Sequence, residues 1–206
     1  MVHLVYWPIA GRAELIRLIA KVGGIEDFSE SPELPDGVTK ADCGSPSGLP
    51  LLIDGDLKMN ESSAIEFYLS LIAPKYSSLT PQQRAKDAQF ASLKESCLMA
   101  FGTPLLSGKD TEKIQAAADK WFPVLEGILP ESGFVNGLDY PTVADLAILN
   151  ICEAYMPFKA AYKYGEVDLA AKYPKLVAHS DRVKADEDVA KVLSESTSME
   201  AAAFGM

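Results

Sequence analysis

The chain has 206 residues, of which 48% are hydrophobic and 23% charged, and this balance argues against extensive disorder. Twenty-nine acidic residues against 19 Lys and Arg give a net charge of −10, and no basic run stands out. Because binding to nucleic acid depends on clustered cations, we expect no nucleic-acid partner.

The N-terminus lacks the basic start and apolar run of a signal peptide, and no stretch approaches the roughly 18 apolar residues of a membrane helix. Cys43, Cys97 and Cys152 are far apart and form no C-x-x-C pair, which favours reduced thiols over a disulfide framework. His3 and His179 are the only histidines, so we expect no metal site. These features predict a soluble, cytoplasmic protein with no membrane partner.

The chain is expected to begin with a strand and a helix. Residues 2–6 form an apolar run of strand length. Over residues 15–22, apolar side chains recur with helical spacing, and Gly23-Gly24 offers a left-handed stop. Residues 26–47 are polar and contain three prolines, so we expect mostly loop there, with any second strand only weakly indicated.

A hairpin and a second helix are expected next. Residues 49–53 are typical of a strand, Asp54-Gly55 is a tight-turn signal, and 57–59 would be the return strand. Capping residues at 60–63 precede a helical apolar face over 64–72. The economical interpretation is a small α/β domain.

The second part of the chain is expected to be all-α. Helical composition and spacing extend over four segments, 82–104, 110–128, 142–156 and 174–193. Thr142 to Asp145 has the shape of a capping box, and the tail from 194 to 206 is expected to be loosely held or to form a lid. We therefore predict an α/β domain over 1–74, a linker over 75–81 and a helical domain over 82–206.

Two short segments could bind a ligand. If the Leu49-Pro50 bond is cis, it turns the backbone N–H and C=O of Leu49 toward an extended ligand; a trans proline at an edge strand is the commoner alternative. Glu61 and Ser62 lie where a helix begins, and the positive end of the helix favours an anion there. Ser62 could bind a carboxylate or only cap the helix, and Glu61 could hold an ammonium group.

Tyr6 and Arg12 are the other candidates. Tyr6 ends the first strand, so its phenol either points into a cleft or packs as a core aromatic. Arg12 lies at the expected start of a helix, where the dipole prefers anions, which indicates that its charge serves a site or an ion pair.

Four segments together resemble the cytosolic glutathione transferases of tyrosine type, within the sigma, alpha, mu and pi group and with a sigma-like class favoured. They are Tyr6 to Glu14, Gly48 to Leu52, Asn60 to Ile65 and Pro141 to Ala147. The resemblance implies an α/β thioredoxin-like N-terminal domain followed by an all-α domain. This division agrees with the one that the apolar patterns predict.

The resemblance implies catalytic roles for Tyr6, whose hydroxyl would stabilise the glutathione thiolate, and for Arg12, which would support it. Lowering a thiol pKa by roughly two units from about 8.5 takes about 2.7 kcal/mol, and one charge-assisted hydrogen bond supplies about 1.5–3 kcal/mol. No metal is then required. The apolar second substrate is expected to bind in a cleft beside Trp7, Ile9, Met99 and Phe101.

Further residues would hold glutathione itself, as a co-substrate. The resemblance implies Leu49 for the cysteinyl backbone with Pro50 cis, Ser62 and Glu61 for the γ-glutamyl group, Lys40 for the glycyl carboxylate, and Glu95 as the acidic residue from a partner subunit. No tryptophan precedes Lys40 at the spacing usual in tyrosine-type members, and no aromatic key occurs near 44–47. These two departures from the family pattern predict a weaker or differently built glycyl site and a more polar dimer interface.

The leading prediction is a homodimeric glutathione transferase that conjugates glutathione to small hydrophobic electrophiles, with a role in detoxification. One alternative is a sigma-like glutathione-dependent isomerase or peroxidase. The other is a non-enzymatic ligand-binding or structural protein on the same scaffold. Conjugation with a broad electrophile panel discriminates between the enzyme and the inert scaffold.

Overall fold

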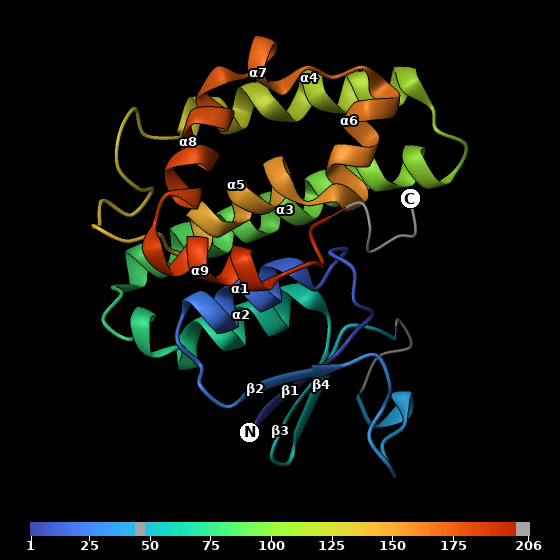
Figure 1. Ribbon diagram of the computed structural model, residues 1–206, viewed down its shortest axis with the longest axis vertical. Coiled ribbons are helices and arrows are strands. Elements are labelled where there is room, and N and C mark those ends of the chain that lie inside the picture. The colour runs from blue at the N-terminus through green and yellow to red at the C-terminus, as the bar shows by residue number, and fades with distance from the viewer. Residues whose placement is uncertain (44–47, 201–206) are drawn as a thin grey trace.

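The computed structural model describes residues 1–43 and 48–200, and a four-stranded sheet lies at one end of it, below a layered stack of helices (Figure 1). The strands are β1 (Val2–Val5), β2 (Phe28–Ser31), β3 (Leu51–Asp54) and β4 (Leu57–Asn60). Their order is β2-β1-β3-β4. β1 is parallel to β2 and antiparallel to β3, and β3 is antiparallel to β4.

Two helices separate the sheet from the rest of the molecule, α1 (Glu14–Val22) and α2 (Ser62–Ile72) (Figure 1). Leu4 of the central strand β1 is fully buried in the core that these helices share with the sheet. Val5 and Leu51 form a second, smaller buried cluster. The sheet is therefore covered mainly by helices on one face, and the C-terminal end of β1 lies at the edge of that contact.

The parallel strand β2 is the element that the sequence indicated only weakly. Its residues have no alternating burial pattern, because none of them is fully buried. Instead, its serines are matched by a polar neighbour: the His3 ring bonds to Ser29 Oγ at 2.9 Å and to Ser31 Oγ at 3.1 Å. Pairing with β1, rather than apolar periodicity, makes this segment a strand.

The remaining chain is helical. The long elements are α3 (Pro81–Leu106), α4 (Thr111–Ile128), α5 (Val143–Glu153), α8 (Pro174–Lys184) and α9 (Glu187–Glu195), and the short ones are α6 (Ala160–Gly165), α7 (Leu169–Lys172), η1 (Lys40–Cys43), η2 (Pro74–Tyr76) and η3 (Tyr155–Lys159). α5 is almost wholly buried and packs against α3, α8 and α1. It joins the helical part to the sheet part in one continuous core.

Three helical predictions needed correction. The helix expected over 142–156 ends at Glu153, because Met156 precedes a proline and adopts an extended backbone, with a ψ of 132°. The helix expected over 174–193 is two helices, since Asp186 caps α9 with hydrogen bonds to the backbone of Asp188 and Val189. The segment 160–172, which carried no prediction, forms α6 and α7.

A dense hydrogen-bond cluster supports the start of α5, and we call it the capping network (Thr142, Asp145, Asp87, Asn136 and His179). Asp145 accepts from the backbone N–H of Thr142 at 2.8 Å and contacts His179 Nε2 at 2.9 Å. Asp87 accepts from Thr142 Oγ1 at 2.7 Å and from Asn136 at 3.0 Å. All five residues are buried, so this network joins α3, α5 and α8.

The segment after α9 returns to the sheet part of the molecule. Ser198 Oγ donates to Glu14 on α1 at 2.6 Å, and the Tyr155 N–H donates to the Met199 carbonyl at 2.9 Å. Both Ser198 and Met199 are buried. The expectation of a loosely held tail is therefore wrong for this segment, and residues 201–206 lie outside the described part of the chain.

Candidate functional site

Tyr6 lies just beyond the end of β1, and its ring is 7% exposed. Its backbone N–H donates to the Ser31 carbonyl at 3.0 Å, which extends the β1–β2 pairing by one residue. The Tyr6 hydroxyl oxygen accepts from the Arg12 backbone N–H at 3.1 Å. The hydroxyl proton is not used in this bond, so it is available to another acceptor.

Gly11 permits this close approach of the turn to the phenol. Its φ is +46°, in the left-handed region that favours glycine, and a Cβ at this position would lie 2.4 Å from the Tyr6 hydroxyl oxygen. The Gly11 N–H donates to the Met156 carbonyl at 3.3 Å, so the turn is also held by η3. The hydrogen bond from Gly11 to Met156 thus connects the turn beside Tyr6 to the helical part of the molecule.

The sequence placed Arg12 at the start of a helix, where its charge would oppose the helix dipole. In the structure α1 begins at Glu14, so Arg12 precedes the helix. Its Nη1 forms an ion pair with Glu95 Oε1 on α3, and its Nη2 lies 3.0 Å from Met99 Sδ. Because α1 and α3 come from different parts of the chain, the pair connects the sheet part to the helical part. Of the two roles expected for Arg12, a site or an ion pair, the structure shows the ion pair.

A polar cavity of about 280 Å³ lies on one side of Arg12. Its other lining residues are Leu49, Pro50, Glu61 and Ser62, which the sequence analysis singled out in two separate segments. The Leu49-Pro50 bond is cis. The structure therefore brings the segment before β3 and the start of α2 together around one guanidinium.

Backbone geometry at the start of α2 is unusual. Glu61 has a φ of 72°, and a non-glycine residue in this region costs about 1–3 kcal/mol. Ser62 is the first residue of the helix and is 5% exposed, and within the described chain the N-cap Glu61 makes no side-chain cap to it. The first helical turn presents backbone N–H groups toward this region, which favours a bound anion.

An apolar cavity of about 310 Å³ lies on the other side of Arg12, which lines both cavities. Tyr6 also lines it, and its remaining walls come from the turn before α1, from α3 and from η3: Ile9, Gly11, Leu98, Met99, Gly102, Thr103, Leu106, Met156 and Pro157. Tyr6 and Arg12 thus stand at the junction of a polar and an apolar space. A polar ligand and an apolar ligand could meet there.

Of the residues predicted for the apolar cleft, Ile9 and Met99 line this cavity. Trp7 is 53% exposed and packs on Tyr6 with ring centroids 5.5 Å apart, outside the cavity. Phe101 is fully buried and stacks on Phe122 with centroids 5.2 Å apart. Its prediction is corrected, because the face of α3 that carries Phe101 points into the helical core.

Glu95 and Lys40 are the last of the predicted residues. Glu95 pairs with Arg12 of its own chain, through an oxygen that faces the site. The Lys40 backbone belongs to η1, but its side chain lies outside the described part of the structure. The cavities therefore involve Glu95 only through Arg12.

Arg17, which the sequence analysis did not single out, holds the turn that follows Tyr6. Its guanidinium donates to the carbonyls of Trp7 at 2.8 Å and Ile9 at 2.7 Å, and it lies 5.8 Å from the centre of the Tyr6 ring. Glu14 and Glu30 neutralise it, at 3.1 and 2.6 Å. The i,i+3 spacing of Glu14 and Arg17 could have indicated an ion pair from the sequence. The hydrogen bonds from Arg17 to the turn after Tyr6 depend on the tertiary structure.

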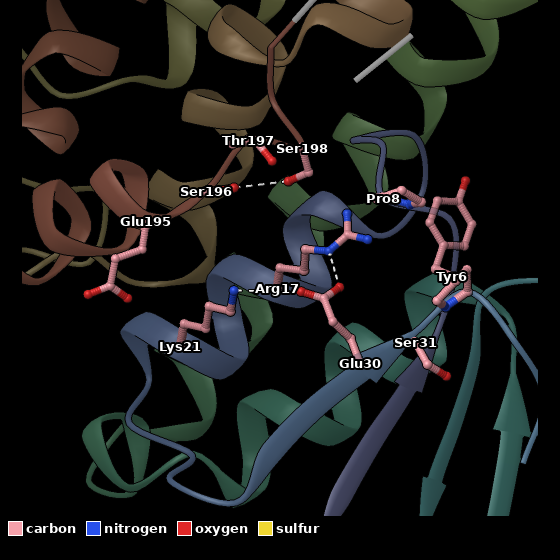
Figure 2. Close-up of a pocket in the computed structure, with 11 residues that line it drawn as sticks. Tyr6, Pro8, Arg17, Lys21, Glu30, Ser31, Glu195, Ser196, Thr197 and Ser198 are labelled. Carbon is pink, nitrogen blue, oxygen red and sulfur yellow. Dashed lines mark hydrogen bonds and ion pairs between the residues drawn. The ribbon is translucent and has the colours of Figure 1, made fainter. Parts of the chain in front are cut away.

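A third cavity of about 270 Å³ lies behind Tyr6, and Figure 2 shows its walls. Arg17 and Lys21 project from α1 toward Glu30 on β2, and Ser196 and Ser198 of the C-terminal segment lie opposite. Burial raises the pKa of Glu14, the carboxylate beneath this cavity, against the opposing effect of Arg17. Tyr6 forms part of the wall of this cavity, whereas Leu49 and Ser62 line only the polar cavity.

Among the described residues, no group of three or more His, Cys, Asp or Glu side chains is placed to hold a metal ion. None of the helices in the described chain combines the length and the apolar character that crossing a membrane requires.

Comparisons with known proteins connect this arrangement to one family. Residues 100–196 match the model of the glutathione S-transferase C-terminal domain. A Dictyostelium discoideum protein assigned by name to glutathione S-transferase alpha-2 is 29% identical over 155 residues, which are 71% of each chain. A Caenorhabditis elegans glutathione S-transferase structure is 25% identical, with a TM-score of 0.72 over 95% of this chain and 98% of that chain.

A second solved structure has the same fold. A glutathione S-transferase of the hookworm Necator americanus, described as monomeric, is 22% identical, with a TM-score of 0.71 over 94% of this chain and 96% of that chain. The chain therefore resembles glutathione transferases in its C-terminal sequence over residues 100–196 and in its whole fold. Its fold is the thioredoxin-like α/β part followed by a large helical part that the resemblance predicted.

Proposed function

We propose that this protein is a glutathione transferase of tyrosine type, in which the Tyr6 hydroxyl stabilises the thiolate of glutathione. One observation carries the proposal: the Tyr6 hydroxyl accepts from the Arg12 N–H and keeps its own proton free, at the junction of the polar and apolar cavities. A hydrogen bond from this proton to sulfur is charge-assisted once the thiol ionises. The match of residues 100–196 to the glutathione S-transferase C-terminal domain supports glutathione as the co-substrate, and no resident metal is part of the proposal.

The polar cavity would hold glutathione. The γ-glutamyl carboxylate fits the first turn of α2 at Ser62, and Glu61 would hold its ammonium group. The backbone of Leu49, before the cis bond to Pro50, would pair with the cysteinyl part of glutathione. Lys40 remains the proposed partner of the glycyl carboxylate.

The apolar cavity would hold the electrophile. Its walls are mostly apolar, and Ile9, Leu98 and Met99 would exclude water from the reacting carbon. The thiolate, held at the Tyr6 hydroxyl, attacks that carbon; a carbon–sulfur bond forms and the leaving group departs with the electron pair of its bond. Removing the stabilising donor should slow this step by one to about three orders of magnitude.

The test is conjugation of glutathione to a chloronitrobenzene and a panel of other electrophiles, followed spectroscopically. We expect activity in the wild type and a fall in kcat by a factor of about 10–1000 in Tyr6→Phe, with nearly unchanged glutathione affinity. Tyr164→Phe is the control, because the Tyr164 hydroxyl bonds to Lys109 and Tyr164 lines neither of the two cavities. Absence of conjugation with the whole panel would contradict the proposal and favour an isomerase, a peroxidase or an inert scaffold.

We also propose that the protein is a cytoplasmic homodimer with a role in detoxification. Cys97 and Cys152 are free, buried thiols, which supports a reducing compartment. Phe67, Leu71 and Ile72 on α2 are exposed apolar side chains that a second subunit could cover. Light scattering measures the molar mass in solution, and a monomeric mass would contradict the homodimer. The hookworm structure is described as monomeric.

The domain division at 75–81 is likewise a proposal. The family model lies wholly within the helical part, at 100–196, which supports a separate C-terminal domain. The proposed linker contains the end of η2 and the first residue of α3.

A further inference from the structure

Four charged side chains of alternating sign lead from the site into the contact between α2 and α3, and we call them the charge chain (Arg12, Glu95, Lys94 and Glu66). Glu95 Oε1 pairs with Arg12, and Glu95 Oε2 lies 3.6 Å from Lys94 Nζ. Lys94 Nζ in turn donates to Glu66 Oε1 at 2.6 Å. Lys94 and Glu66 are each 1% exposed, so the inner half of the chain is cut off from water.

A buried ion pair at this position is a poor way to stabilise the fold. Removing each ion from water costs several kcal/mol, and well-packed apolar residues of similar volume are usually at least as stabilising. Burial raises the pKa of Glu66 to about 7, against the opposing effect of Lys94. Glu66 Oε2 is buried with no hydrogen-bond partner in the described structure. Stability therefore does not explain this pair.

The geometry of Glu95 indicates what the pair does instead. An arginine and a carboxylate commonly form two parallel hydrogen bonds, which use both oxygens. Here the carboxylate is divided: Oε1 pairs with Arg12, whereas Oε2 is buried without a hydrogen-bond partner among the described residues and forms only a longer ion pair with Lys94, at 3.6 Å. Arg12 Nη2 is directed to Met99 Sδ, on the wall of the apolar cavity, rather than to Glu95.

We propose that Lys94 and Glu66 are positioning residues that hold Glu95 to a single contact with Arg12. The charge of Lys94 attracts the second oxygen of Glu95 without a hydrogen bond, and Glu66 holds Lys94 in place from α2. Part of the Arg12 guanidinium is thereby left unneutralised between the two cavities, where its positive charge favours the thiolate. The role in catalysis rests on the proposed function, whereas the division of the Glu95 carboxylate does not.

The main test replaces the buried pair with apolar side chains in the double variant Glu66→Leu/Lys94→Met. We expect wild-type folding, and we expect the pH midpoint of thiolate formation on bound glutathione to rise by about half a unit to one unit. The ultraviolet absorption of the thiolate reports this midpoint. Lys175→Met is the matched control, because it removes a lysine from an exposed ion pair with Glu131 on the far side of the helical part.

A midpoint equal to that of the wild type in a folded double variant would overturn the inference. Glu66→Gln serves if the double variant does not fold. It releases Lys94 toward Glu95, which draws Glu95 away from Arg12, so the midpoint should fall by a few tenths of a unit. An unchanged or raised midpoint in Glu66→Gln also overturns the inference.

A crystal structure of the double variant separates this inference from the proposed function. If Glu95 then binds Arg12 through both oxygens, the positioning role is supported, even if the wild type proves not to bind glutathione. If the wild type conjugates glutathione but Glu95 keeps its single contact in the variant, the inference fails and the proposed function stands.

Discussion

The capping network and the charge chain are both buried and both rich in carboxylates, but they are satisfied to different degrees. Asp145 in the capping network receives hydrogen bonds on both oxygens, from the backbone of Val135 and Thr142 and from His179. Glu66 in the charge chain receives one, from Lys94. A buried carboxylate with hydrogen bonds on both oxygens stabilises the fold, whereas incompletely paired charges with shifted pKa values are typical of functional sites.

Asp87 lies between these two extremes. Its Oδ1 accepts three hydrogen bonds, from Thr142, Asn136 and the Ala144 N–H, but its Oδ2 has no partner within the described residues. Burial raises the pKa of Asp87 from 3.8 to about 6, a rise similar to that of Glu66, from 4.5 to about 7. Burial is the largest cause of both shifts, and the three hydrogen bonds on Asp87 oppose its shift without cancelling it.

Asp145→Ala should have the largest effect, and it tests the structural half of this comparison. It removes the acceptor of several buried hydrogen bonds at once, so we expect a loss of about 3–5 kcal/mol in the free energy of unfolding. Urea denaturation measures the loss. Asp168→Ala, at the exposed cap of the short helix α7, should cost only about 1 kcal/mol. Equal losses of unfolding free energy in the two variants would show that the capping network stabilises the fold no more than an ordinary exposed helix cap.

Gly11→Ala should come next, and it tests the site half. The added Cβ would overlap the Tyr6 hydroxyl, so we expect a loss of about 2–4 kcal/mol in stability and a fall in kcat of at least about tenfold. Gly24→Ala is the matched control, because Gly24 also has a positive φ, +78°, but a Cβ there would meet no atom of the described residues within 4 Å. Wild-type kcat in Gly11→Ala would mean that the position of the phenol does not matter.

Glu66→Gln should change how the free energy of unfolding varies with pH more than it changes the value of that free energy at a single pH. The folded-state pKa of Glu66 is raised to about 7, so between pH 4.5 and 7 the folded protein keeps a proton that the unfolded chain releases. The free energy of unfolding of the wild type should therefore fall as pH rises through this window, by about 1–3 kcal/mol from this group. Urea denaturation at several pH values should show a flatter profile in Glu66→Gln. Parallel profiles would contradict the raised pKa.

Ser62→Ala should have the smallest effect. The loss of one hydrogen bond to a carboxylate should raise the apparent KM for glutathione about tenfold and leave stability nearly unchanged. Steady-state kinetics at varied glutathione concentration measures this. Ser63→Ala is the neighbouring control, because Ser63 is exposed and does not line the polar cavity. An unchanged KM together with reduced stability would return Ser62 to the role of a helix cap.

Much of the fold and part of the site could be predicted from the sequence, because they depend on short-range patterns. Apolar spacing predicted α1 and α2, a turn signal predicted the β3–β4 hairpin, and the Thr142–Asp145 capping box was visible as four consecutive residues. Tyr6 stood out because it ends the predicted first strand. Arg12 stood out because a cation is unfavourable at the predicted start of a helix.

Only the tertiary structure decided which distant residues meet. Helical spacing places Leu98 and Phe101 on one helix, but packing against α4 and η3 determines that Leu98 lines the apolar cavity while Phe101 is buried. The strand β2 exists because β1 pairs with it, and the isomer of Leu49-Pro50 is nearly balanced in free energy until the fold selects cis. Glu66 and Lys94 are 28 residues apart, and no local pattern links them. Local sequence determines elements and their ends because those energies are short-ranged, whereas pairing of buried charges depends on long-range packing.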